Sequence, residues 1–306
     1  MSEAQKLNEA EKAERPPGAG TVSVVIPARN AAATIASQLA ALWRQTYPGP
    51  WEVVVVDNGS HDGTGEVLRS WQLRMPQLKV VSAPASGGAN HARNIGCRHA
   101  RGELVLCCDA DDLVAPDWMT AMVETLRTSP AVGGSMERRM LNGSVALAAR
   151  PPRGADRLLD TFGFLPYPLG ANCGFHKELW RRLGGFDESY RYGSDDVEFF
   201  WRAQLAGYRL DFAPDAVVHY RLRAEPRAIV HQQYRYGRSH AKLYRDFGPH
   251  GMPRSRPAEA ARAWWGLLLH ARDLAASPES RGAWLAVLAL RAGRIAGTLR
   301  HRRRYL

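Results

Sequence analysis

Short runs of β-branched residues alternate with longer segments of helical periodicity from Thr21 onward. The predicted strands are 22–26, 53–56, 78–81 and 104–108. The predicted helices between them are 34–44, 65–74 and 88–100. The second strand is continuously apolar, which is typical of a parallel strand that is covered on both faces. The pattern predicts a doubly wound α/β unit with a mostly parallel sheet.

Polar residues follow three of the predicted strands. They are Pro27-Ala28-Arg29-Asn30 after the first strand, Asp57-Asn58-Gly59-Ser60 after the second and Asp109-Ala110-Asp111-Asp112 after the fourth. Ligands of such sheets bind beyond the carboxyl ends of the strands. We therefore expect the three segments to line one crevice.

The sequence pattern changes after Pro130. Segments rich in glycine and arginine follow, without a clear βα periodicity, and from Glu225 onward the chain is helical and basic. The predicted organisation is a flexible leader at 1–20, a nucleotide-binding half at 21–130, an acceptor half at 131–224 and a basic helical tail at 225–306.

The formal net charge of +11 favours anionic partners. We expect no nucleic-acid partner, because no nucleic-acid-binding motif is recognisable and the acidic triplets would repel a phosphate backbone. The first 20 residues have no apolar segment of the secretory type, and the longest apolar stretches are too short to span a membrane. These features predict a cytoplasmic protein, either free or peripheral at the inner face of the cell membrane.

Asp109 and Asp111 stand at the mouth of a buried strand. Hard carboxylate oxygens suit Mg²⁺ or Mn²⁺ bridging a diphosphate, and Asp112 adds a third carboxylate. A turn followed by a helix N-cap would explain the same residues equally well.

Two further positions have a functional and a structural interpretation. Asp57 can accept hydrogen bonds from the N–H groups of a nucleobase, or it can simply open a turn. Arg93 near a helix start can pair with phosphate, although exposed arginines on helices are usually solvated surface.

The chain resembles the family 2 glycosyltransferases of the GT-A fold over about residues 21–220. Six blocks carry the resemblance in order: 24–30, 57–60, 92–96, 109–112, Gly184-Gly185-Phe186-Asp187-Glu188 and Asp195-Asp196-Val197-Glu198. The resemblance implies an α/β Rossmann-like fold for nucleotide-diphospho-sugars, with a mostly parallel central sheet and an appended C-terminal helical tail. It also implies inverting transfer from a UDP-, GDP- or dTDP-sugar to a saccharide or lipid-linked acceptor.

The resemblance also implies roles for single residues. Contacts with the donor are expected from Pro27, Arg29, Asn30, Asp57, Arg93, Asn94, Asp109, Ala110 and Asn172. Metal ligation is expected from Asp109, Asp111 and His219. The catalytic base is expected to be Asp196, with Asp195 as the fallback, because Asp stands at 195 where the family usually has Glu. Ser194 is the expected N-cap of the helix that follows.

Two alternatives stay open from the sequence. The departure at Asp195 is also compatible with a nucleotide-sugar-binding protein that transfers nothing. In the tail, Trp264, Trp265 and Trp284 either pack against the catalytic domain or rest in an anionic membrane interface. The apolar face formed by Trp284, Leu288, Ile295 and Leu299 is interrupted by Arg291.

Overall fold

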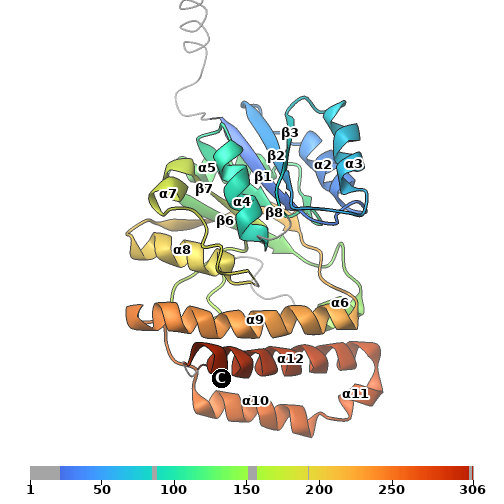
Figure 1. The fold of residues 1–306 in the computed structure, drawn as a ribbon, viewed down its shortest axis with the longest axis vertical. Helices are drawn as coiled ribbons and strands as arrows, with labels where there is room; N and C mark the ends of the chain where they lie inside the picture. Colours follow the sequence, from blue (N-terminus) through green and yellow to red (C-terminus); the bar gives the residue numbers. More distant parts are fainter. Residues whose placement is uncertain (1–20, 85–87, 151–156, 192, 303–304, 306) are drawn as a thin grey trace, which may run out of the picture.

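A single mixed sheet organises the first two thirds of the protein (Figure 1). The computed structural model describes residues 21–84, 88–150, 157–191, 193–302 and 305, so the predicted leader at 1–20 lies outside the described residues. The strand order is β3-β2-β1-β4-β7-β6-β8-β5. Its strands are β1 (Val22–Ala28), β2 (Trp51–Asp57), β3 (Leu78–Ser82), β4 (Leu104–Cys108), β5 (Leu113–Val114), β6 (Ala131–Glu137), β7 (Asn172–His176) and β8 (Leu210–His219).

The predicted α/β alternation is confirmed in the first half of the chain. Strands β3, β2, β1 and β4 are neighbours and pair in parallel, so their carboxyl ends reach the same edge of the sheet. The helices of this half are α2 (Ile35–Trp43), α3 (Thr64–Gln72), α4 (Gly88–His99) and α5 (Trp118–Leu126). Every predicted helix up to residue 100 is present, with ends within two residues of the prediction.

Three strands after Pro130 had no counterpart in the sequence pattern. Strand β6 pairs in parallel with β8, whereas β7 runs antiparallel to both β4 and β6. Glycine has a low strand propensity, so the pattern did not predict β6 and β7. The packing of these strands nevertheless requires glycine. A Cβ on Gly133 would lie 2.4 Å from Cβ of Pro168, and one on Gly174 would lie 2.7 Å from Cδ2 of Leu106.

Helices cover both faces of the sheet, and the buried apolar side chains form two large cores besides a small cluster between β2 and α4. One core joins α2, α3 and α5 to the sheet, and the other joins α4, α7 (Lys177–Arg182) and α8 (Asp195–Leu205). The short helix α6 (Ser144–Ala149) follows β6. All four cysteines are buried and free.

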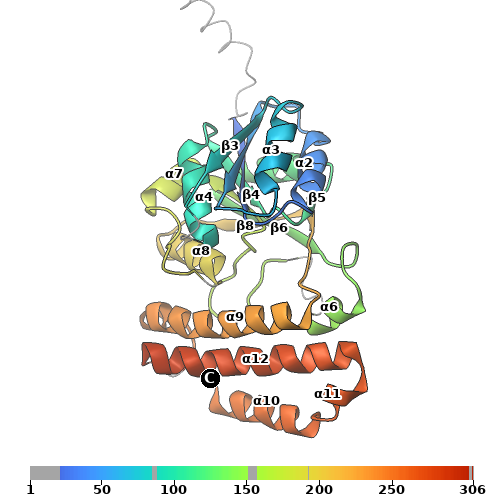
Figure 2. The same ribbon diagram turned by 45° about the vertical axis from the view of Figure 1, so that its right-hand side comes forward.

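The C-terminal helices stack in layers beneath the sheet, as Figures 1 and 2 both show. They are α9 (Pro226–Phe247), α10 (Pro257–Leu269), α11 (Asp273–Ala276) and α12 (Pro278–His301), with a 3₁₀ turn at Gly248–His250. Helix α9 lies nearest the sheet, α12 lies beneath α9, and α10 is outermost. Residues Ala241, Leu243 and Phe247 of α9 belong to the same core cluster as Phe199 and Trp201 of α8. The first tail helix therefore shares a hydrophobic core with the helices that cover the sheet.

Small residues, not the predicted large apolar face, pack α12 against α9. The buried residues of α12 are Gly282, Ala286, Ala289, Gly293 and Gly297. A Cβ on Gly237 of α9 would lie 2.1 Å from the carbonyl oxygen of Leu290, so the two backbones nearly touch.

The tryptophans of the tail do not reach the sheet. Helices α9 and α12 separate α10, which carries Trp264 and Trp265, from the sheet. The indole N–H of Trp284 donates to the Leu267 carbonyl at 2.9 Å and joins α12 to α10. Of the two alternatives for the tail, packing against the sheet is therefore excluded for Trp264 and Trp265. None of the helices in the described part of the chain combines the length and apolar character that crossing a bilayer requires.

Candidate functional site

Three carboxylates lie together directly after β4. Oxygen atoms of Asp109, Asp111 and Asp112 all lie within 4.8 Å of one another. Burial and the charge of Asp109 raise the pKa of Asp111, and the same two causes raise the pKa of Asp112 further. The buried Oδ2 of Asp112 has no hydrogen-bond partner among the described residues. Crowded, hard oxygen ligands of this kind fit a divalent cation, because its charge would relieve their repulsion.

Buried polar and apolar groups hold this acidic loop in place. The side-chain N–H of Gln38 donates to the Asp109 carbonyl at 3.2 Å, and its oxygen accepts from the Val114 amide at 3.1 Å. Ala110 is buried in the adjoining core, so its methyl group packs against the protein. The carboxylates are therefore positioned by residues from α2 and the sheet.

Arg93 of α4 joins the acidic loop to the start of α8. Its Nη2 donates to Oδ1 of Asp109 at 2.9 Å, and its Nη1 donates to Oδ2 of Asp195 at 2.6 Å. Burial lowers the pKa of Arg93, but the two carboxylates outweigh that effect and raise the pKa overall. Two donor groups of the guanidinium therefore bind carboxylates. The buried Nε of Arg93 has no hydrogen-bond partner among the described residues, and its contact with phosphate stays a prediction.

Asp196 does not take part in that ion pair and accepts hydrogen bonds from two backbone N–H groups. Its Oδ2 accepts from the Gly170 amide at 2.9 Å, and its Oδ1 accepts from the Val197 amide at 2.8 Å. Burial and the neighbouring charge of Asp195 raise the pKa of Asp196 to about 6. A carboxylate with this pKa can accept a proton near neutral pH.

Ser194 stands at the predicted N-cap position of α8, but its side chain does not cap the helix. Ser194 adopts the left-handed conformation at φ 62° and makes no side-chain cap bond. Its hydroxyl lies 2.8 Å from the hydroxyl of Ser239 on α9. A tertiary partner has taken the oxygen that would have capped the helix.

The segments after β1 and β2 are held side by side. Asp57 accepts the Ser60 amide at 3.0 Å with Oδ1, as the turn interpretation requires. The Asn30 amide donates to the Ser60 hydroxyl at 2.9 Å, and Asn30 is one of the non-glycine residues with positive φ, at 52°. Arg29 and Asn30 are exposed, and Pro27 is half-buried. These residues lie at the predicted crevice edge.

Two asparagines expected at the donor instead hold the fold together. The side-chain N–H of Asn94 donates to the carbonyl of Phe186 and to Glu188, while its oxygen accepts from Phe186 and Trp180. Asn172 is fully buried; it accepts from the Trp118 indole and donates to carbonyls of β6 and β8. With their polar groups used this way, neither side chain is available to a ligand.

His219 ends β8 and lies outside the group of three carboxylates. Its Nδ1 is 3.1 Å from Oε2 of Glu137, a residue that the sequence interpretation missed. Such a contact leaves the other ring nitrogen for a metal or for solvent. Glu137 lies opposite His219 in the parallel β6–β8 pairing, which only strand register could have revealed.

Two arginines after β8 also escaped the sequence interpretation. The side chain of Arg221 donates to the Asp111 carbonyl at 2.8 Å, and its amide donates to Asp112 at 2.7 Å. Nη2 of Arg223 lies 3.6 Å from Oδ2 of Asp111. The sequence signal that could have indicated these contacts is the alternation Arg221-Leu222-Arg223 soon after an apolar segment.

Comparison with known proteins identifies the family. The family model "Glycosyl transferase family 2" matches residues 23–184, and "Glycosyl transferase family group 2" matches 153–291. Glycosyltransferase AglE of Haloferax volcanii is 31% identical over 199 residues, which are 64% of this chain and 65% of AglE. Poly-beta-1,6-N-acetyl-D-glucosamine synthase of Staphylococcus epidermidis is 24% identical over 74% of this chain and 57% of its own length. The chain thus spans less than two thirds of these curated relatives.

Solved structures share the fold. The mannosyltransferase PcManGT from Pyrobaculum calidifontis, in complex with GDP-Man and Mn²⁺, superposes with a TM-score of 0.62. It is 24% identical, and the match covers 96% of this chain and 93% of PcManGT. S. aureus TarS 1-349 superposes with a TM-score of 0.54 at 18% identity, covering 94% of this chain and 93% of that one. The predicted GT-A type of fold is confirmed.

Proposed function

The chain belongs to glycosyl transferase family 2, and from that premise we propose that it moves a sugar from a nucleotide-sugar donor to an acceptor hydroxyl with inversion. The observation that carries the proposal is the Arg93 bridge. It holds Asp109, at the acidic loop, and Asp195, beside the candidate base Asp196, in one ion-pair network. Transfer requires the site that holds the leaving diphosphate and the base that accepts the hydroxyl proton to lie close together.

The chain's own residues supply the steps of transfer. The N–H groups of Gly170 and Val197 orient the Asp196 carboxylate, which takes the proton of the acceptor hydroxyl. Arg93 holds Asp195 away from that task. The two acids thus have separate roles. Asp195, which stands where the family usually has Glu, forms the ion pair, and Asp196 is left as the base.

Mg²⁺ or Mn²⁺ is the proposed cofactor, with Asp109, Asp111 and the free nitrogen of His219 as ligands. When bound, the cation would neutralise the diphosphate that leaves. The acidic cluster supports this assignment through its crowding and the raised pKa of Asp111.

The proposed donor is a UDP-, GDP- or dTDP-sugar, held at Pro27, Arg29, Asn30 and Asp57. The structural neighbours support this class, since they were solved with GDP-Man, UDP or UDP-GlcNAc. The proposed acceptor is a saccharide or a lipid-linked saccharide of a cell-surface glycan. Support comes from the relative that synthesises a poly-N-acetylglucosamine.

Turnover of Asp196→Asn tests the proposal. We expect kcat to fall by about 10²–10⁴-fold while the nucleotide dissociation constant stays unchanged. Asp215→Asn, an exposed acid on β8, is the matched control and should keep full activity. EDTA should stop the wild-type reaction and Mn²⁺ should restore it. If the wild type binds nucleotide with Mn²⁺ but neither transfers nor hydrolyses any donor, the protein is a nucleotide-sugar binder.

We further propose a cytoplasmic location with contact to the inner face of the membrane through α10. Trp265, Leu268 and Leu269 are each more than 60% exposed on this outermost helix. The double variant Trp265→Ser/Leu268→Ser should lose co-sedimentation with phosphatidylglycerol vesicles. Equal recovery of wild type and variant would rule out this contact.

A further inference from the structure

Arg223 lies on the segment that connects β8 to α9, and the backbone just before it is fixed at the acidic loop. The Arg221 amide donates to Asp112 at 2.7 Å. The Leu222 amide donates to the side-chain oxygen of Asn142 at 2.7 Å, and the Leu222 side chain is buried. The side chain of Arg223, in contrast, is 58% exposed. Its guanidinium can therefore reorient while the segment that carries it stays in place.

The Arg223 guanidinium lies between groups of opposite charge. On one side its Nη2 is 3.6 Å from Oδ2 of Asp111. Burial and Asp109 raise the pKa of Asp111, and the charge of Arg223 acts in the opposite direction. On the other side Arg223 lines a pocket of about 290 Å³ together with Arg191, Ala228, His231, Gln232, Arg235 and Tyr236. None of these lining residues is acidic, so the acid that Arg223 contacts is Asp111.

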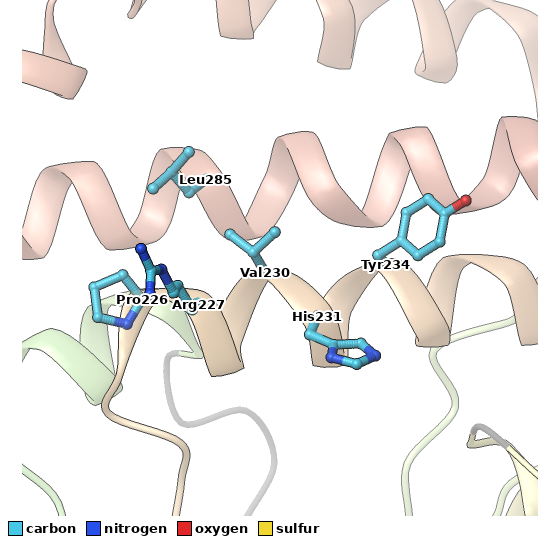
Figure 3. A pocket seen from close by; sticks show the side chains of 6 residues that line it. All are labelled: Pro226, Arg227, Val230, His231, Tyr234 and Leu285. Carbon is cyan, nitrogen blue, oxygen red and sulfur yellow. The ribbon is translucent and has the colours of Figure 1, made fainter.

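The basic pocket lies on the side of α9 that faces the sheet. Its lining residue His231 points away from α12, as Figure 3 shows. Helix α12 lies beneath α9, and the sheet lies on the other side of α9. Tyr236, another lining residue, packs against Gly193, where an added Cβ would lie 2.5 Å from the ring. Because Gly193 lies just before Asp195, the pocket is a neighbour of the proposed transfer site.

We propose that Arg223 is a positioning residue that couples binding of the cation to binding of the donor. Arg223 pairs with Asp111 until that carboxylate ligates a divalent cation, and the released guanidinium then becomes available to the diphosphate of the donor. Once Asp111 ligates the cation, Arg223 faces a net positive charge and loses the attraction that held it there. A guanidinium suits a diphosphate because it offers paired donors. The inference rests on the proposed function and adds the residue through which cation and nucleotide favour each other.

Calorimetric titration of the full chain with Mn²⁺, in the absence of nucleotide, tests the first half of the inference. Arg223→Gln should bind Mn²⁺ about fivefold more tightly than the wild type, because the cation no longer replaces an exposed ion pair. Arg223→Lys keeps the charge and should bind Mn²⁺ within about twofold of the wild type. The matched control is Arg209→Gln, which removes a pair with Asp211 at 2.8 Å whose partners are 60% and 33% exposed. This control should leave Mn²⁺ binding unchanged.

Titrations with UDP, GDP and dTDP test the second half. With saturating Mn²⁺, Arg223→Gln should bind the preferred nucleotide about tenfold more weakly than the wild type, through loss of one charge-assisted hydrogen bond. With EDTA in place of Mn²⁺, the variant and the wild type should agree within about twofold, because Asp111 then holds Arg223 in the wild type. A residue that only maintained the fold would weaken the binding of both ligands, whereas Arg223→Gln should change the two affinities in opposite directions.

The possible failures can be told apart. If Arg223→Gln binds Mn²⁺ no more tightly than the wild type, the inference is overturned. An equal loss of nucleotide affinity with Mn²⁺ and with EDTA also overturns it, because Arg223 would then contact the nucleotide independently of the cation. The same changes in Arg209→Gln would show a general effect of surface charge and have the same consequence. Failure of Mn²⁺ or of every nucleotide to bind the wild type would instead refute the proposed function.

Discussion

Replacing Arg93 by methionine should destabilise the protein by about 3 kcal/mol, because two carboxylates lose their buried cation. The side chain of Arg93 is 5% exposed and contacts Asp195 at 2.6 Å and Asp109 at 2.9 Å. Breaking a buried ion pair costs about 3–5 kcal/mol. The Asp109 side chain is 30% exposed, so water recovers part of the loss and the lower end of that range applies. Arg93→Lys should recover about half of the loss, since a point charge cannot serve both carboxylates at once.

Urea denaturation followed by tryptophan fluorescence measures this effect. The matched control is Arg69→Met, which removes an ion pair with Glu66 at 2.7 Å whose partners are 69% and 70% exposed. That pair should contribute at most about 1 kcal/mol. If Arg93→Met costs no more than Arg69→Met, then the Arg93 network does not hold the acidic loop and α8 together, and the observation behind the proposed mechanism fails.

Two further predictions follow from the site and from the helix layer. The rate of transfer should fall as pH drops below about 6, because burial and Asp195 raise the pKa of Asp196 to about 6 and only its deprotonated form accepts a proton. A pH profile of kcat with no acidic limb in Asp196→Asn checks this, and an unchanged limb in that variant would exclude Asp196 as its source. Gly237→Ala should destabilise the protein by about 1–3 kcal/mol through overpacking against α12, since its Cβ would lie 2.1 Å from the Leu290 carbonyl. Gly266→Ala on α10, with nothing within 4 Å, should instead leave the thermal midpoint unchanged or raise it.

The sequence by itself determined the first half of the fold and the chemistry at its edge. Periodicity located β1, β2, β3 and β4 because each strand is a short run rich in β-branched or apolar residues between polar turns. Since β2 and β4 both pair in parallel with β1, Asp57 and Asp109 follow strands that end at the same edge of the sheet, as the sequence predicts. The ordered motifs also identified the family.

Tertiary structure alone decided which polar side chains are bound by other parts of the chain. Arg93 and Asp195 are 102 positions apart, and nothing local distinguishes an arginine that meets phosphate from one that meets two carboxylates. The structural partners of Asn94 and Asn172 could not be predicted for the same reason, because they come from distant strands and loops.

Long-range packing also decided the second half of the sheet and the place of α9. The glycines of β6 and β7 carry no strand signal, yet they are the residues that let the strands approach their neighbours. The small residues of α12 carry little apolar signal, yet backbone contact with α9 requires them. Hydrophobic periodicity reveals positions where large apolar side chains are buried. The close approach of two backbones depends instead on small side chains, which give almost no hydrophobic signal.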